Sequence, residues 1–445
     1  MTRLAGIRIC VVGAGTSGLA ATRLCLARGA RVTLTDTRAR SAVGSEVLAL
    51  EAAGARLALG GHHEAGLDAC ELVIVSPGVP MFSELARAEA GGVRIWGEVE
   101  LATRCLASEA PVIAVGGTNG KSTVTSLLAH VLAADGRRVF AGGNLGEPLS
   151  DHVDEAFDAV VLEVSSFQME RVDAFRPRVS ILLNITPDHL DRYPGLDAYA
   201  RAKGNAFARQ TARDLAIVPH GDARCLAEAR RGAGRVLTFG ASGDALVTLD
   251  AVLVSGERYE RGAFGVQGGH NALNAAAAIL ALHDLGVAPG TIRGALATFH
   301  GLAHRMALVR TVGGVRFYDD SKGTNVGASV TALLGVPEAR VVLVAGGRDK
   351  GGSYAPLAEA LREKGRAAVL IGEARDLIAG ALGLSCEVAL AETMEDAVAK
   401  ARALARPGDA VLLSPACSSF DMFRDYKHRG DVFAAAVHAL EEPSP

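Results

Sequence analysis

Residues 112–123 read Val-Ile-Ala-Val-Gly-Gly-Thr-Asn-Gly-Lys-Ser-Thr, which is a short apolar strand running directly into a glycine-rich turn. In such a strand–turn–helix unit, the backbone N–H groups of the turn and of the helix N-terminus face an anion. Lys121 can reach terminal phosphates, and the Ser122 hydroxyl can ligate Mg²⁺. The strict pattern would place glycine at Val115, so a fortuitous glycine-rich turn stays open as the alternative. The segment predicts an α/β unit that binds ATP or a related nucleotide.

The length and composition of the chain restrict the classes of protein to consider. Its 445 residues suggest about three domains, and a hydrophobic content of 49% supports full globular packing. A net charge of −3 gives no support for nucleic-acid or membrane-surface binding. No apolar stretch reaches the ~18 residues of a membrane span. The 7 cysteines lack CxxC spacing, so we expect reduced thiols in a cytoplasmic protein, with neither a disulfide framework nor a zinc site.

Three α/β units follow one another along the chain. The first carries Gly13-x-Gly15-x-x-Gly18 after a buried strand, and Asp36 closes its second strand, a pattern typical of NAD-binding folds. The same glycines also serve as a tight turn and a helix-packing device, so the NAD interpretation is not favoured. Ligands are expected at the carboxyl ends of the strands, between domains. The expected strands are 7–12, 31–36, 72–75 (as the third strand), 112–115, 160–164, 179–184, 315–318, 341–345, 368–371 and 410–413, and the expected helices include 16–28 and 273–285.

Polar groups cluster where strands of the central unit end. Glu163 ends one strand and is placed to hold Mg²⁺ or its water, although an ordinary helix-capping glutamate is the alternative. His189 lies among acidic residues after the next strand, and Lys203 follows in an expected helix over 199–207. Asn271 and Asn274 are three residues apart on an Ala/Leu-rich helix, so we expect their amides to bond a ligand or an adjoining loop.

The use of lysine in this chain is selective. Only seven of the 46 basic residues are lysines, and the rest are arginines. A position that keeps lysine in such a chain is therefore a candidate for a function that needs a primary amine, although chance placement is the alternative. Five of them lie in or beside Gly- and Asp-rich turns, namely Lys121, Lys203, Lys322, Lys350 and Lys427. In the third unit, Cys417 lacks a nearby base in the sequence and is not favoured as a nucleophile.

Taken together, these motifs resemble the Mur ligase family over nearly the whole chain. The family has the same shortened phosphate turn, which accounts for Val115, and the remaining motifs match in order and spacing. Within the family they are similar to the branch that adds D-glutamate. The motifs that carry the resemblance are Gly116–Thr123, Glu163–Gln168, Asp188–Tyr193, His270–Asn274, His304-Arg305, Asp320–Asn325 and Ser414–Ser419.

The resemblance implies a fold and a reaction. The fold is a Rossmann-like UDP-sugar-binding domain over 1–97, a central P-loop ATPase-type domain with a mostly parallel sheet over 98–301, and a Rossmann-like amino-acid-binding domain over 302–445. ATP phosphorylates the carboxylate of UDP-N-acetylmuramoyl-L-alanine, and D-glutamate attacks the acyl phosphate to form an amide, in peptidoglycan precursor synthesis. A cytoplasmic monomer without nucleic-acid or membrane partners is expected.

The resemblance also implies roles for individual residues. ATP contacts are Gly117, Thr118, Asn119, Gly120, Lys121, Ser122, Thr123, Asn271, Asn274, Arg305 and Asp320. The catalytic set is Lys121, Glu163, His189 and Lys203, and two Mg²⁺ ions are held by Ser122, Glu163, His189 and Lys203, the last as a CO₂-derived carbamate. Contacts to the two other substrates are Thr16, Ser17, Asp36, Thr37, Arg38, Gly78, Asn144, Ser165, Gln168, His304, Lys322, Thr324, Lys350, Ser419, Phe420 and Tyr426.

Two departures and three alternatives accompany the resemblance. Ala303 stands where proline is common, which predicts a less stiff hinge, and Tyr426 stands where phenylalanine is common. A sister ligase or a folylpolyglutamate synthase is the nearest alternative, and the absence of an Asp-Asn-Pro-Arg motif counts against the diaminopimelate branch. A nicotinamide-dependent oxidoreductase and a non-catalytic nucleotide sensor leave the central motifs unexplained.

Overall fold

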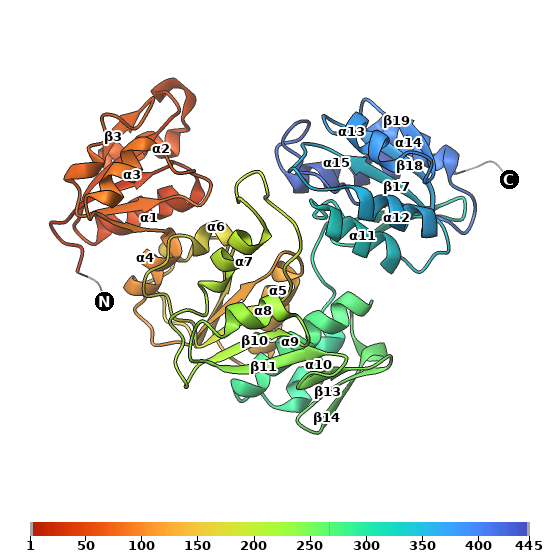
Figure 1. The fold of residues 1–445 in the computed structure, drawn as a ribbon, viewed down its shortest axis with the longest axis horizontal. Helices are drawn as coiled ribbons and strands as arrows, with labels where there is room; N and C mark the ends of the chain where they lie inside the picture. The colour runs from red at the N-terminus through yellow and green to blue at the C-terminus, as the bar shows by residue number, and fades with distance from the viewer. Residues whose placement is uncertain (1–2, 267, 443–445) are drawn as a thin grey trace. The chain divides into compact units, whose positions relative to one another are not determined.

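The computed structural model describes residues 3–266 and 268–442, which form three β-sheets with helices on their faces (Figure 1). The expected α/β fold with mostly parallel sheets is confirmed by the strand pairing. Backbone contacts divide the described chain into two compact units. The first unit comprises residues up to 185 together with 200–265 and 272–299, and the second comprises 186–199, 266, 268–271 and 300–442. The domain boundaries at 97 and 301 stay a prediction.

The N-terminal sheet has five parallel strands. Their order is β3 (Arg56–Leu59), β2 (Arg31–Asp36), β1 (Arg8–Val12), β4 (Leu72–Val75) and β5 (Arg94–Trp96). The prediction that 72–75 is the third strand is wrong, because the short β3 precedes it. Its sequence, Arg-Leu-Ala-Leu, carries no β-branched residue and therefore gives little strand signal. The helices of this region are α1 (Thr16–Ala27), α2 (Ser45–Ala52), α3 (Ser83–Ala90) and α4 (Glu98–Cys105).

The glycines after β1 act in chain packing. Gly13 has a φ of +95°, and a Cβ added to Gly18 would lie 1.8 Å from the Gly13 carbonyl oxygen. Helix α1 can therefore begin directly over the turn only because residue 18 has no side chain. The exposed start of α1 leaves Thr16 and Ser17 at the carboxyl edge of the sheet.

The central sheet has nine strands. Their order is β14 (Glu257–Glu260), β13 (Ala251–Val254), β12 (Ala245–Val247), β11 (Arg235–Gly240), β10 (Leu215–Pro219), β9 (Val179–Leu182), β6 (Val112–Gly116), β8 (Ala159–Glu163) and β7 (Val139–Gly143). From β12 through β7 the pairs are parallel, and β13 and β14 add an antiparallel edge. The strands β6, β8 and β9 place their carboxyl ends side by side, which brings the three central motifs to one edge of the sheet.

The helices of the central region differ from expectation mainly at their ends. They are α5 (Lys121–Ala134), α6 (Ser166–Met169), α7 (Leu196–Gly204), α8 (Ala223–Ala229), α9 (Gly269–Asp284) and α10 (Pro289–Thr298). The expected helix over 199–207 instead begins at Leu196 and ends at Gly204. Residues 205–207 continue as tight turns, in which the N–H groups of Ala206 and Phe207 donate to carbonyls three residues back. Lys203 keeps its predicted place in a helix.

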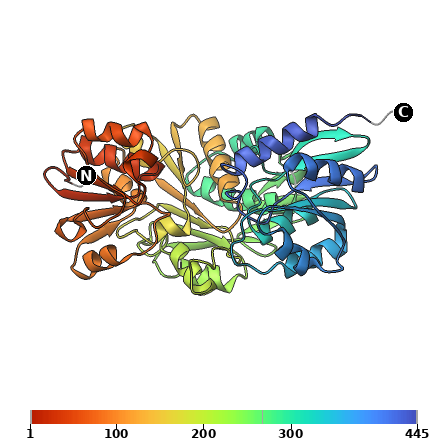
Figure 2. The same ribbon diagram turned by 90° about the horizontal axis from the view of Figure 1, so that it is seen from above.

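The C-terminal sheet has six strands and buries both faces. Their order is β15 (Ala307–Val312), β16 (Val315–Asp319), β20 (Ala410–Leu413), β17 (Val341–Gly346), β18 (Gly365–Ile371) and β19 (Glu387–Leu390). One face packs on α11 (Val326–Gly335), α12 (Ala355–Lys364) and α13 (Arg375–Leu382). The other packs on α14 (Met394–Leu404) and α15 (Tyr426–His438), the dark-blue helix in Figure 2. Burial on both faces explains the nearly continuous apolar strands.

The structure also describes the state of the cysteines and the lengths of the apolar helices. All 7 cysteines are free thiols, and five of them are buried. Within residues 3–266 and 268–442, no helix is both long and apolar enough to cross a membrane.

Candidate functional site

The phosphate turn after β6 is held in shape by a side chain from a neighbouring strand end. The Asn184 Oδ1 accepts hydrogen bonds from the Thr118 and Asn119 N–H groups at 3.1 and 2.8 Å. Its Nδ2 donates to the Asn119 carbonyl at 3.1 Å. Three hydrogen bonds with one amide, two accepted and one donated, therefore hold the turn in shape. The sequence placed Asn184 only at the end of a strand, so its role as the brace of the turn was missed.

Gly120 joins this turn to helix α5 in a left-handed conformation. Its φ is +85°, and helix α5 begins at the next residue, Lys121. A Cβ at residue 120 would lie 2.5 Å from the Asn274 Oδ1. Asn274, which is buried on α9, therefore contacts the turn, as the amide on an apolar helix led us to expect. The predicted ATP contacts Gly120 and Asn274 are thus neighbours in one unit.

We expect Gly120→Ala to lower stability and weaken binding of a nucleoside triphosphate by about tenfold. The left-handed conformation costs a non-glycine residue about 1–2 kcal/mol, and the new methyl group displaces the Asn274 amide. Thermal unfolding and calorimetric titration measure the two effects. Gly136→Ala is the matched control, because Gly136 has a φ of +80° and a methyl group added there would meet no atom within 4 Å. Equal nucleotide affinity in both variants would contradict the role given to the contact.

A buried carboxylate at the end of β8 faces the start of helix α5. Glu163 is 1% exposed. Its Oε2 accepts from the Ser122 Oγ at 2.5 Å, and its Oε1 accepts from the Asn144 Nδ2 at 2.6 Å. The helix-capping alternative for Glu163 is wrong, because Ser165 is the cap of the following helix and Glu163 is the last residue of β8.

The donors around Glu163 fit Mg²⁺. A carboxylate and a hydroxyl oxygen converge at the phosphate turn, and Mg²⁺ prefers oxygen ligands while keeping several waters. In the described part of the chain, no group of three or more His, Cys, Asp or Glu side chains forms a complete metal cage.

Two lysines border the phosphate turn within the same unit. The Lys121 Nζ donates to the Thr118 carbonyl at 2.8 Å, and the Lys203 Nζ donates to the Gly117 carbonyl at 2.8 Å. Lys203 is only 5% exposed, although lysine side chains are rarely buried to this extent. A nearly buried amine beside a phosphate-binding turn supports a specific role for this residue.

Ser165 and Gln168 form a reciprocal capping box at the start of α6. The Ser165 Oγ accepts from the Gln168 N–H at 3.2 Å, and the Gln168 Oε1 accepts from the Ser165 N–H at 2.9 Å. Both side chains therefore shape the loop after Glu163. Their predicted substrate contacts remain a prediction.

The N-terminal sheet carries its polar groups at its carboxyl edge. The Asp36 Oδ2 accepts from the Ala14 N–H at 2.7 Å, and its Oδ1 accepts from the Arg38 N–H at 2.9 Å. Burial raises the pKa of Asp36, but hydrogen bonds from Arg38 and Ala14 outweigh it and lower the pKa to about 2. Asp36 is thus ionised and ties β2 to the glycine turn, while Thr37 and Gly78 are exposed at the same edge.

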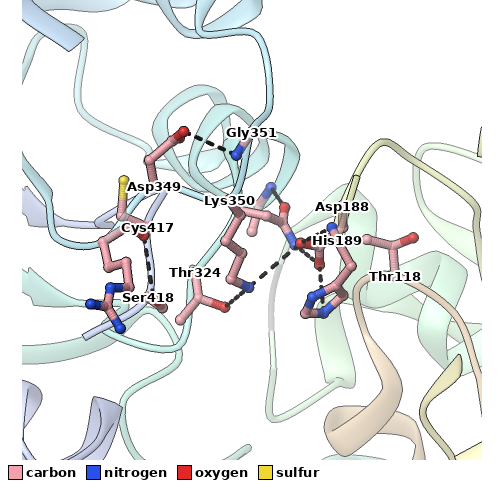
Figure 3. A network of polar contacts seen from close by, with 12 residues as sticks. Thr118, Asp188, His189, Thr324, Asp349, Lys350, Gly351, Cys417 and Ser418 are labelled. Carbon is pink, nitrogen blue, oxygen red and sulfur yellow. Dashed lines mark hydrogen bonds and ion pairs between the residues drawn. The ribbon is translucent and has the colours of Figure 1, made fainter. Parts of the chain in front are cut away.

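In the second unit, a loop after β9 meets two loops of the C-terminal sheet (Figure 3). The Lys350 Nζ lies 3.5 Å from both the Asp188 Oδ1 and the Thr324 Oγ1. The Asn325 Nδ2 donates to the Asp188 Oδ2 at 3.3 Å. His189 is next to Asp188, with its Nε2 3.7 Å from the Asp188 Oδ2. A lysine, a hydroxyl and an amide thus lie in one polar cluster around the Asp188 carboxylate.

The segment from His304 to Asp320, also in the second unit, contains two buried carboxylates, Asp319 and Asp320. The His304 Nδ1 lies 2.6 Å from the Asp319 Oδ2, and His304 has a φ of +60°. The Asp320 Oδ2 accepts from the Ser414 Oγ at 2.7 Å, and burial raises the pKa of Asp320 to about 7. Arg305 lowers that pKa through its charge. The predicted contacts His304, Arg305 and Asp320 thus belong to one polar cluster.

The remaining residues predicted to contact the amino-acid substrate lie on neighbouring loops of the C-terminal sheet. The Lys322 Nζ lies 4.0 Å from the centre of the Tyr426 ring, which is a cation–π distance. Ser419 is buried, whereas Phe420 is 68% exposed. An exposed phenylalanine beside polar loops is available to contact a ligand.

Cys417 has the surroundings of a structural thiol. It is buried, its Sγ lies 3.1 Å from the Tyr354 hydroxyl, and burial raises its pKa to about 11. A thiol that stays protonated at neutral pH is a poor nucleophile. These surroundings support the prediction that Cys417 is not a nucleophile.

The structure groups the predicted residues in two sets. In the first unit, Ser122, Glu163 and Asn144 are hydrogen-bonded to one another, and Lys121 and Lys203 border the turn. In the second unit, the set comprises Asp188, His189, Thr324, Lys350, Lys322, Tyr426, His304, Arg305 and Asp320. Asn271 belongs to the second unit, although Asn274, on the same helix, belongs to the first.

Three family models match the chain. They are described as "Mur ligase MurD-like, N-terminal domain" over residues 7–97, "Mur ligase middle domain" over 115–282 and "Mur ligase, glutamate ligase domain" over 304–417.

Curated relatives are similar over nearly the full length. A protein of Syntrophotalea carbinolica is 42% identical over 99% of each chain, and one of Geobacter metallireducens is 43% identical over 98% of each chain. A protein of Myxococcus xanthus is 41% identical over 98% of this chain and 99% of its own. Each is named UDP-N-acetylmuramoylalanine--D-glutamate ligase.

Solved structures share the fold at low sequence identity. The UDP-N-acetylmuramate-alanine ligase MurC of Thermotoga maritima has a TM-score of 0.61 at 21% identity, covering 97% of this chain and 99% of its own. The MurF ligase of Thermotoga maritima, solved with ADP, has a TM-score of 0.63 at 17% identity, covering 92% and 95%.

Proposed function

Because the chain belongs to the Mur ligase family, we propose that it joins D-glutamate to UDP-N-acetylmuramoyl-L-alanine in an ATP-dependent reaction. The observation that carries the proposal is the 42% to 43% identity, over at least 98% of the chain, to ligases with that name. The resemblance inferred from the motifs is confirmed at the level of the family. A place in peptidoglycan precursor synthesis follows from the product.

The reaction activates a carboxylate that is otherwise a poor electrophile. ATP transfers its terminal phosphoryl group to the carboxylate of the L-alanine residue, which creates an acyl phosphate with a good leaving group. The amine of D-glutamate attacks the acyl carbon, and the tetrahedral intermediate expels phosphate to leave an amide. The N-terminus of helix α5 and the Lys121 amine are placed to face the phosphates of ATP, whereas the Thr118 and Asn119 N–H groups are bonded to Asn184 and hold the turn in shape. Asn274 is placed to orient the turn.

The carboxylate of Glu163 and the hydroxyl of Ser122 would hold Mg²⁺, which when bound offsets the repulsion between the phosphates and the attacking carboxylate. Asn144 orients the Glu163 carboxylate through its 2.6 Å hydrogen bond. Its contact with the sugar-nucleotide substrate is also part of this proposal. The burial of Glu163 strengthens these electrostatic interactions.

Lys203 is proposed to act as a carbamate formed with CO₂. A free ammonium group would repel a metal ion, whereas a carbamate is an anionic oxygen ligand, and only a primary amine can form it. His189 is proposed as its partner for a second Mg²⁺ ion. We therefore propose two Mg²⁺ ions and a carbamate on Lys203. We also propose that the enzyme is a monomer.

D-glutamate is proposed to bind the C-terminal loops, with Lys322 and Lys350 facing its carboxylates. We expect Lys322→Met to raise the KM for D-glutamate at least about tenfold, because one charge-assisted contact to a carboxylate is lost. The KM for ATP should change less than twofold. Initial rates at varied concentrations of each substrate measure both values. Equal changes in both would mean that the loop serves ATP instead.

Release of phosphate is the direct test of the proposed function. The protein is incubated with ATP, Mg²⁺ and UDP-N-acetylmuramoyl-L-alanine against a panel of D- and L-amino acids. Release that depends on D-glutamate, with the amide product found by mass spectrometry, supports the proposal down to the substrate. Release with another amino acid would assign the chain to a sister branch. No release with any amino acid would overturn the proposed reaction.

A further inference from the structure

Arg429, on the first turns of α15, is an almost completely buried arginine without a carboxylate partner. It is 1% exposed, and among the residues that the structure describes no carboxylate lies within ion-pair distance of it. Its Nε donates to the Ser321 Oγ at 3.0 Å, and its Nη2 donates to the Ser321 carbonyl at 2.8 Å. Its Nη1 donates to the Cys417 and Ser418 carbonyls at 3.3 and 3.4 Å.

This arrangement is costly for a purely structural residue. Taking a guanidinium out of water is unfavourable, and buried charges are ordinarily paired with opposite charges. Here the hydrogen-bond acceptors are a hydroxyl and three carbonyls, which are neutral. Burial lowers the pKa of Arg429 to about 10, while the charges of Cys417, Asp421, Asp319 and Asp320 raise it. The guanidinium therefore remains charged at neutral pH.

The acceptors of Arg429 belong to loops that follow adjacent strands of the C-terminal sheet. Ser321 follows β16, and Cys417 and Ser418 follow β20, which neighbours β16 on one side and β17 on the other. The loop after β17 is also close, because a Cβ on Gly347 would lie 3.3 Å from the Arg429 Nη1. Arg429 thus lies beneath three neighbouring loops at the carboxyl edge, where ligands of such sheets bind.

The same loops are also hydrogen-bonded to one another. The Ala416 N–H donates to the Gly323 carbonyl at 2.9 Å. Arg348 and Ser418 exchange backbone hydrogen bonds at 3.0 and 3.1 Å. Two of the carbonyls bonded by Arg429 thus belong to this network, because Ser418 ties its loop to Arg348 and Cys417 lies between Ala416 and Ser418.

Each of these loops also carries a residue proposed to contact D-glutamate. Lys322 follows Ser321, Ser419 follows Ser418, and Lys350 lies on the loop that contains Gly347. The Ser321 Oγ, which accepts from Arg429, donates to the Tyr426 carbonyl at 2.8 Å, and the Tyr426 ring lies under the Lys322 amine. Arg429 therefore bonds residues of two of these loops and lies next to Gly347 of the third.

We propose that Arg429 is a positioning residue for the amino-acid substrate, holding the three loops in register and placing a buried positive charge beneath a site for a dicarboxylate. The proposal rests on the proposed function of these loops. An arginine suits this role because its planar fork reaches several carbonyls at once, which a lysine amine cannot do. The charge adds to those of Lys322 and Lys350, which favours a ligand with two carboxylates over one with a single carboxylate.

The test compares Arg429→Met, Arg429→Lys and Arg366→Met in steady-state kinetics. We expect Arg429→Met to raise the KM for D-glutamate about 10- to 100-fold, with less than a twofold change in the KM for ATP. Arg429→Lys should recover part of that loss, since it restores the charge but not the fork. Arg366→Met is the matched control, because Arg366 lies on β18 of the same sheet and bonds Asp409, which is outside the three loops. Equal effects on both substrates, or the same KM pattern in Arg366→Met, would overturn the proposal.

Hydrogen exchange of the full-length protein gives a second measurement that does not depend on the reaction. In Arg429→Met, the amides of Ala416, Ser418 and Arg348 should exchange at least about tenfold faster, while the amides of β17 and β20 keep their protection. Unchanged exchange in the three loops would overturn the positioning role even if activity is lost. If the wild-type protein fails to ligate D-glutamate, the proposed function fails, and faster loop exchange in Arg429→Met would still support the positioning of the loops.

Discussion

Lys203→Arg lowers kcat by about 10³-fold or more while the protein keeps its fold. This corresponds to roughly 4 kcal/mol, the magnitude expected when transition-state stabilisation by a metal ligand is lost. Arginine retains the positive charge and the length of the side chain but cannot form a carbamate with CO₂. Initial rates at saturating substrates measure kcat, and thermal unfolding reports whether the fold is retained.

The position of Lys203 makes this variant informative. Its amine is nearly buried and lies 2.8 Å from the Gly117 carbonyl, so a change there acts directly on the phosphate turn. Lys400→Arg is the control, since Lys400 lies on α14 and pairs with Asp396 on the same helix. The wild-type enzyme should also lose rate in CO₂-depleted buffer and regain it with bicarbonate. A Lys203→Arg variant with more than a tenth of the wild-type rate would contradict the carbamate.

Glu163→Gln lowers kcat/KM by about 10²- to 10³-fold and raises the Mg²⁺ concentration needed for half-maximal rate. The amide keeps the shape of the side chain and still accepts a hydrogen bond, but it loses the negative charge that attracts the metal ion. We expect the melting temperature to stay the same or rise, because a buried charge is removed. Titration of the rate with Mg²⁺ separates this effect from a loss of substrate binding.

Glu71→Gln is the matched control for this variant. Glu71 is an exposed glutamate that pairs with Arg8, and it lies away from the phosphate turn. Its substitution should leave the Mg²⁺ requirement unchanged. If Glu163→Gln shows the wild-type Mg²⁺ requirement, then Glu163 does not hold the metal, and its contacts with Ser122 and Asn144 are structural.

The chemistry of the site could be predicted from the sequence wherever a short motif carries its own geometry. The turn ending in Lys121-Ser122 specifies a phosphate site, because glycines and a helix N-terminus act over a few consecutive residues. The place of Glu163 at the end of a strand was predicted in the same way and is confirmed, whereas its role in holding a metal ion stays a prediction. The strands near these motifs were predicted within one or two residues of their observed ends.

Features that depend on contacts between distant segments could not be predicted. The brace from Asn184 to the turn joins residues 65 positions apart, and the bonds from Arg429 to Ser321 span 108 positions. A sequence pattern contains no information on which acceptor such a side chain reaches. The short strand β3 was also missed, because its residues favour a strand only through pairing with β2.

The sequence by itself determined the class of fold and the kind of chemistry, because the turns and strand ends that bind phosphates and carboxylates are local features. Only the tertiary structure decided which residues hold those turns in place. Asn184 fixes the phosphate turn and Arg429 supports the loops of the C-terminal sheet, since parallel strands bring their carboxyl ends to one edge whatever their separation along the chain.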